Sequence, residues 1–189
     1  MADAFGYWRL ATHFLCLVEA ASHELVRTDN TWVFVSDEDI SESAYESATE
    51  WSDHTVGIAV LFDFFHGVEL MLKGFIALDG SIPRHHRLIE LLADFEASHP
   101  GTEVGALVAT YTRDLDRGSP LGIFLAANGL EIDSWNEALK YPESKKGKRF
   151  DHLRLKYGGL DTVGFWRTLS SAAREIRVAA VKLARSMGH

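Results

Sequence analysis

Apolar residues spaced three and four positions apart predict a series of amphipathic helices along the chain. The first helix is expected from about Ala4 to Arg27. Its apolar stripe consists of Leu10, Phe14, Leu17, Val18, Ala21 and Leu25. A second helical region is expected from Ser41 to Leu78, with a break near Ser52 and Asp53. The later half of this region is apolar on nearly every side, which is typical of the central helix of a bundle.

The rest of the chain predicts shorter helices and one long final helix. A third helix follows Pro83, a fourth runs from about Val104 to Leu115, and the last from about Asp161 to Ser186. The third is expected to bury Leu88, Leu91, Leu92 and Phe95. Residues 118–159 are less regular and are expected to hold one or two short helices around Ile123 and Trp135, followed by a loop. The segment Trp32–Val35 suits a strand-like piece or a lid.

This pattern predicts an all-α fold, a bundle of about five helices with a short irregular insert near residues 30–36. A length of 189 residues suits one domain spanning residues 1–189. The single cysteine, Cys16, excludes an internal disulfide and, on the stripe of the first helix, is expected in the core. The first residues lack the basic region of a signal peptide, and the apolar run Val56–Phe62 is too short to cross a membrane. A cytoplasmic protein without membrane contact is therefore expected.

Charge divides the chain into two unequal parts. Residues 140–189 hold 12 basic and 4 acidic residues, a net charge of +8, whereas residues 1–139 hold 7 basic and 23 acidic residues, a net charge of −16. Such asymmetry fits a surface that binds a polyanion on an otherwise repulsive body. It equally fits basic segments that pair with the acidic body, within the chain or across a dimer. The basic part divides further into a loop, residues 140–156, and the final helix.

Three segments of the chain together resemble the HEPN superfamily of helical domains. Residues 61–74 (LFDFFHGVELMLKG) resemble the long helix of that family, with its apolar ridge and embedded Glu and Lys. His86-Arg87-Leu88, followed by Leu91-Leu92, resembles the start of another family helix. Residues 139–143 (LKYPE) with 155–159 (LKYGG) resemble a loop of some HEPN-like proteins. The resemblance covers most of the chain after residue 40.

The resemblance implies a set of functional expectations. HEPN domains often form dimers, and many are metal-independent ribonucleases that act in toxin–antitoxin, phage-defence or RNA-processing systems. In that family a histidine acts on the ribose hydroxyl, and an arginine that precedes it, with four to six residues between the two, stabilises charge on the phosphate. The resemblance therefore implies a homodimer, RNA as a ligand, a partner protein such as an antitoxin, and no cofactor.

This chain departs from the family motif, because no arginine precedes a histidine at the required spacing. The nearest match is Lys146 with His152, and lysine lacks the planar fork of arginine. His152 and Lys146 are thus the candidate catalytic residues of a degenerate ribonuclease. The candidate nucleic-acid-binding residues are Lys145, Lys148, Arg149, Arg154 and Lys156. The alternative is a non-catalytic module that binds a partner protein, a nucleotide or nucleic acid through the basic C-terminal quarter.

A second polar group lies within the apolar central helix. His66, Glu69 and Lys73 are expected to be buried polar residues satisfied by their neighbours, with Glu69 and Lys73 forming a favourable pair four residues apart. A metal-dependent enzyme centred on His66 and Glu69 is a third function class. Bundles that bind two metals need matching Glu-x-x-His pairs on two helices. The buried-polar interpretation of His66 and Glu69 is preferred, and no metal ligands are predicted.

Overall fold

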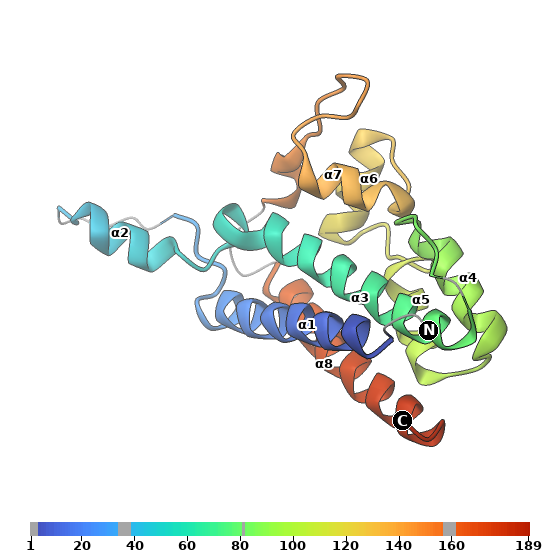
Figure 1. Ribbon diagram of the computed structural model, residues 1–189. Coiled ribbons are helices and arrows are strands. Elements are labelled where there is room, and N and C mark those ends of the chain that lie inside the picture. Colours follow the sequence, from blue (N-terminus) through green and yellow to red (C-terminus); the bar gives the residue numbers. More distant parts are fainter. Residues whose placement is uncertain (1–3, 34–38, 81, 157–161) are drawn as a thin grey trace.

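The computed structural model describes residues 4–33, 39–80, 82–156 and 162–189. Within these ranges the chain forms eight α-helices and no strand, which confirms the all-α class. The three longest are α1 (Ala4–Arg27), α3 (Ile58–Asp79) and α8 (Val163–Ser186). They lie side by side, with α1 packed against both α3 and α8 (Figure 1). The described core lies mainly between these helices and the shorter ones that cover α3.

Most of the shorter helices pack around this group of three. Two of them, α4 (Leu88–Ser98) and α5 (Glu103–Tyr111), connect the end of α3 to the middle of the chain. The next two, α6 (Pro120–Asn128) and α7 (Trp135–Lys140), lie on the other side of α3 from α1 in Figure 1. Of these, α4 and α7 pack against α3, and α5 packs against α8. The remaining helix, α2 (Glu42–Thr49), stands away from the body, and Thr49 is its one buried residue. The helices outnumber the predicted five because residues 41–79 divide into two and the irregular middle contains two more.

The predicted break near Ser52 and Asp53 is present. A short π-helix, Asp53–Gly57, lies between α2 and α3, and the Asp53 amide donates to Asn30 Oδ1 at 2.7 Å. Asn30 Nδ2 in turn donates to Asp53 Oδ2 at 2.9 Å and to Thr162 Oγ1 at 2.5 Å. These buried bonds connect the segments that follow α1 and precede α3 and α8.

The segment after α1 was expected to be strand-like or a lid. Trp32 and Val33 belong to neither helix nor strand and are exposed, while Trp32 stacks on the His54 ring at a centroid distance of 4.4 Å. Residues 34–36 of the predicted insert lie outside the described residues, as does Asp161, the predicted start of the last helix. The described part of α8 begins at Val163.

The buried face of α1 agrees with the predicted stripe at Val18, Ala21 and Leu25 and differs from it elsewhere. Leu10 and Leu17 are 49% and 53% exposed, and Cys16 is exposed too, so these three assignments to the core were wrong. The buried residues are Ala4, Ala11, Leu15, Val18, Ala21, Ser22 and Leu25. One residue turns an α-helix by about 100°, so Leu10 and Leu17 lie toward solvent although the residues that follow them, Ala11 and Val18, are buried.

Helix α3 is the most buried element. Two glycines let α1 approach it closely: a Cβ at Gly67 would lie 2.9 Å from Leu15 Cγ, and one at Gly74 would overlap the Trp8 indole. The stretch Asp53–Asp79 is long and apolar enough to cross a membrane by composition alone. However, 61% of its most apolar window is buried inside the protein, as expected for the core helix of a soluble protein.

Candidate nucleic-acid interface

The most basic stretch of the chain, residues 140–156, folds into a hairpin that projects beyond α7 (Figure 1). Glu143 and Arg149 form an antiparallel bridge, and the Ser144 amide donates to the Lys148 carbonyl at 2.8 Å. The turn closes where the Gly147 amide donates to the Ser144 carbonyl at 2.8 Å. Gly147 has a φ of +77°, a left-handed conformation that glycine adopts without steric cost. This turn places Lys145 and Lys146 at the tip of what we call the basic hairpin.

The base of the basic hairpin is fixed to the body. Asn128, the last residue of α6, is 3% exposed, and its Oδ1 accepts a hydrogen bond from the Asp151 amide at 2.8 Å. The Asn128 carbonyl accepts a second bond, from Lys148 Nζ at 2.5 Å. Phe150 and Leu155 are buried beside it. The sequence analysis did not identify this role of Asn128. The Asn-Gly pair marks the end of α6, where Gly129 is left-handed, but it does not indicate a contact with the hairpin.

His152, the predicted catalytic histidine, lies at the base of the hairpin and is partly buried. Its ring stacks on Phe124 with a centroid distance of 5.5 Å, and Nε2 lies 2.6 Å from the Ala138 carbonyl oxygen. Because a carbonyl oxygen can only accept, Nε2 must carry a proton and donate it. The imidazole therefore links the hairpin to α7.

Lys146, the second predicted catalytic residue, is exposed at the tip. Within the described residues no hydrogen bond or ion pair joins Lys146 to His152. The structure therefore does not bring the two predicted catalytic side chains together.

The other predicted nucleic-acid-binding residues belong to the same hairpin. Lys145 and Arg149 are exposed, and Lys156 is partly exposed. Arg154 is exposed and pairs with Asp151 at 3.2 Å, inside the hairpin itself. Residues 140–156 hold seven basic and two acidic side chains, a net charge of +5. Among the described residues, no ion pair joins these cations to the acidic body.

The basic residues of α8 differ in this respect. Arg177 pairs with Glu19 on α1, and Lys182 Nζ lies 3.2 Å from Glu103 Oε2 on α5. Pairing of basic residues with the acidic body, one of the two interpretations of the charge asymmetry, thus holds for part of α8. Part of the basic face of α8 pairs with the body, whereas Lys145, Lys146 and Arg149 of the basic hairpin are exposed.

The predicted buried polar group forms a second cluster, separate from the hairpin. Glu69 is 1% exposed and Lys73 is 6% exposed, with Lys73 Nζ 2.6 Å from Glu69 Oε1. His86, just before α4, contributes Nδ1 at 3.0 Å from both carboxylate oxygens. The His86 carbonyl accepts a hydrogen bond from Trp135 Nε1 at 2.8 Å, which connects the cluster to α7.

The pKa of Glu69 is lowered from 4.5 to about 2. Burial alone would raise this pKa, but His66, Lys73 and His86 together outweigh burial by favouring the carboxylate. The contribution of His66 is electrostatic, since its Nδ1 lies 3.8 Å from Oε2, beyond hydrogen-bond distance. Glu69 is therefore ionised at neutral pH and balances the buried Lys73 cation.

His66 is only partly buried, and its ring lies between Phe14 and Phe62. One helical turn away, the pKa of Asp63 is raised, because the effect of burial is larger than the opposing effect of His66. Within the described residues no group of three or more His, Cys, Asp and Glu side chains is arranged to hold a metal ion. The cluster is arranged as a buried ion pair between α3 and the start of α4.

No protein-family model, curated protein or solved structure matches this chain. The resemblance to the HEPN superfamily rests on the residues alone. Its first segment is part of α3, its second spans the start of α4, and its third borders the basic hairpin. Residues 157–159 of the third segment lie outside the described residues.

Proposed function

We propose that this protein is an RNA-binding module of a HEPN-like defence, toxin or RNA-processing system, and that the basic hairpin contacts the phosphate backbone without cleaving it. The observation that carries the proposal is the exposed tip formed by Lys145, Lys146 and Gly147, which has no ion pair to the acidic body among the described residues. Cations held this way exchange bound counterions for phosphates, which supplies affinity independent of sequence.

The position of His152 favours binding over cleavage. A general acid or base must reach the proton that it transfers. Nε2 of His152 already donates to the Ala138 carbonyl, and the ring stacks on Phe124. Lys146 lies at the far end of the hairpin, where it cannot assist the same ring. This arrangement supports a structural role for His152. The family resemblance contributes RNA as the polyanion, a homodimer and a protein partner such as an antitoxin to the same proposal.

The proposal is tested by fluorescence anisotropy with a labelled single-stranded RNA of mixed sequence. The variant Lys145→Ala/Lys146→Ala/Arg149→Ala is expected to weaken binding about tenfold or more, because three phosphate contacts are lost. The matched control is Arg167→Ala/Arg174→Ala/Arg185→Ala, which removes three exposed cations from α8 and the same net charge. Equal loss in both variants would mean that net charge, and not the hairpin, governs binding.

The same RNA incubated in chelator tests the absence of cleavage. The wild-type protein is expected to leave it intact. Cleavage by the wild type that disappears in His152→Ala would instead establish the ribonuclease.

A further inference from the structure

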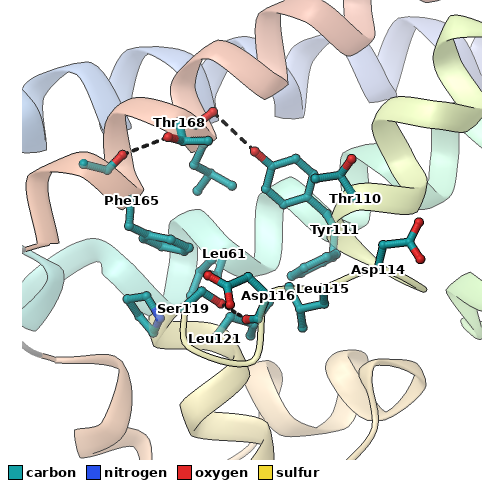
Figure 2. A pocket seen from close by; sticks show the side chains of 14 residues that line it. Leu61, Thr110, Tyr111, Asp114, Leu115, Asp116, Ser119, Leu121, Phe165 and Thr168 are labelled. Atoms are coloured by element: carbon teal, nitrogen blue, oxygen red, sulfur yellow. Dashed lines mark hydrogen bonds between the residues drawn. The ribbon is translucent and has the colours of Figure 1, made fainter.

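A pocket of about 340 Å³ lies between α3, α5, α6 and α8 (Figure 2). It borders the start of α6, whereas the basic hairpin is fixed to Asn128 at the end of that helix. The pocket walls are apolar: they are formed by Leu61, Phe65, Leu115, Leu121, Phe165 and Leu169. The volume is at the lower end of the range for small-molecule sites, roughly 300–1,000 Å³. Apolar cavities of about half this size already hold one benzene ring.

The polar groups at the pocket are few and lie toward its rim. The Tyr111 hydroxyl donates to the Thr168 carbonyl at 3.4 Å, and the Ser119 hydroxyl donates to the Asp116 carbonyl at 2.6 Å (Figure 2). The Asp116 side chain is exposed, and its Oδ1 accepts a hydrogen bond from the Gly118 amide at 2.8 Å. Among the described residues, no hydrogen bond or ion pair uses its second oxygen, Oδ2. Asp114, also exposed, lies further out in Figure 2.

The charge around this pocket is negative. Asp114 and Asp116 are the charged residues among its described lining, which contains no Lys, Arg or His. Burial, and then the charge of Glu175, raise the pKa of the Tyr111 hydroxyl. Arg113, which follows α5, pairs with Glu96 through two hydrogen bonds of 3.0 and 3.2 Å, and Arg117, next to Asp116 in the chain, is not part of the described lining.

We infer that this pocket binds a small organic cation, with an aromatic or aliphatic body against the apolar walls and an ammonium group at Asp116. The walls favour burial of an apolar body by the hydrophobic effect. The rim favours a positive head, because a cation there meets two carboxylates and no competing basic side chain in the described lining. An anionic head group of the same size would be repelled by the same two carboxylates.

Three probes with the same ring and chain length separate the contributions of body and charge. They are 2-phenylethylamine, 2-phenylethanol and phenylacetate, each titrated calorimetrically into the full chain at neutral pH. The amine is expected to bind most tightly, the alcohol about three- to fivefold more weakly, as for an ion pair at an exposed rim, and the anion weakest. Equal binding of all three probes, or no binding of the amine, would overturn the inference.

Two variants locate the site. Asp116→Asn retains the oxygen that accepts from the Gly118 amide, so the turn is preserved while the charge is removed. It is expected to weaken the amine three- to fivefold and leave the alcohol unchanged. The control Asp94→Asn makes the same charge change on the exposed side of α4 and should alter neither. If Asp116→Asn and Asp94→Asn weakened binding of the amine equally, Asp116 would not be the residue that binds the ammonium group.

Thr168→Phe tests the pocket by its volume. Thr168 is exposed on α8 at the mouth of the pocket, so a larger side chain there blocks entry without disturbing the core. Binding of both the amine and the alcohol is expected to fall, with thermal unfolding unchanged. Unaltered binding of both probes would place them elsewhere. RNA binding by the basic hairpin is expected to be the same in all three variants, so the pocket and the proposed function are tested independently.

Discussion

At the residue scale, Glu69 is the polar side chain on which the interior depends most. Its carboxylate receives Lys73 Nζ at 2.6 Å and His86 Nδ1 at 3.0 Å, almost entirely out of contact with solvent. Removing one member of a buried ion pair leaves the other as an uncompensated charge, which costs more than the pair itself contributes. The cluster also joins α3 to the start of α4, so its loss affects the packing of both.

Glu69→Gln is therefore expected to lower the free energy of unfolding by about 3–5 kcal/mol, measured by urea unfolding at neutral pH. The control is Glu90→Gln, which removes a carboxylate that pairs with Arg87 at the exposed start of α4. That pair lies in water, so the control is expected to cost less than about 1 kcal/mol. Equal effects of the two substitutions would show that Glu69 and Lys73 are not a buried pair.

The lowered pKa of Glu69 predicts how stability depends on pH. The pKa in the folded protein, about 2, lies below the ordinary value of 4.5, so the contribution of this carboxylate is complete above the ordinary value and disappears as the pH falls toward 2. The difference corresponds to about 3 kcal/mol. Urea unfolding measured from neutral pH down to pH 2 is expected to show this loss in the wild type and a smaller one in Glu69→Gln. Parallel curves would contradict the assignment.

At the element scale, the basic hairpin depends on one backbone conformation. The positive φ of Gly147 closes the turn that places two lysines at the tip, while Asn128 and Phe150 fix the base. Sequence patterns predicted the loop and its cations, because charge and composition are local properties. They did not predict that His152 would face Ala138, because that contact depends on how α6 and α7 pack.

Gly147→Val is expected to open the hairpin, since a β-branched residue at positive φ costs about 1–2 kcal/mol. The matched variant is Gly147→Asn, because asparagine tolerates this conformation. Hydrogen exchange of the Phe150 amide, which donates to the Pro142 carbonyl at 3.0 Å, is expected to be about tenfold faster in the valine variant than in the asparagine variant. The same rate in both would mean that the turn does not require glycine.

The helices show the same division between local and long-range information. The bounds of α1 and the central position of α3 were predicted correctly, because periodicity and an all-apolar surface are visible in the sequence. The buried face of α1 was predicted only in part, since Leu10 and Leu17 are exposed although they are as apolar as the buried Leu15. The close approach at Gly67 and Gly74 decides which of them faces α3, and that contact joins residues far apart in the chain.

At the scale of the whole molecule, the uneven charge separates into two different arrangements. Along α8, Arg177 and Lys182 pair with acidic residues of α1 and α5, so part of this positive charge is neutralised within the fold. The basic hairpin carries a net charge of +5 on a chain whose total is −8, and its cations have no ion pair to the body among the described residues. In the proposed function, the acidic body repels RNA and contact is expected at this projection.

The salt dependence of RNA binding tests this account most directly. The logarithm of the association constant falls linearly with the logarithm of salt concentration, with a slope of about 0.7 for each phosphate neutralised on a single strand. The Lys145→Ala/Lys146→Ala/Arg149→Ala variant is expected to have a slope smaller than that of the wild type by about 2, because three phosphate contacts are lost. The α8 control variant is expected to keep the wild-type slope. Identical slopes for the wild type and the hairpin variant would contradict the claim that the hairpin contacts the RNA backbone.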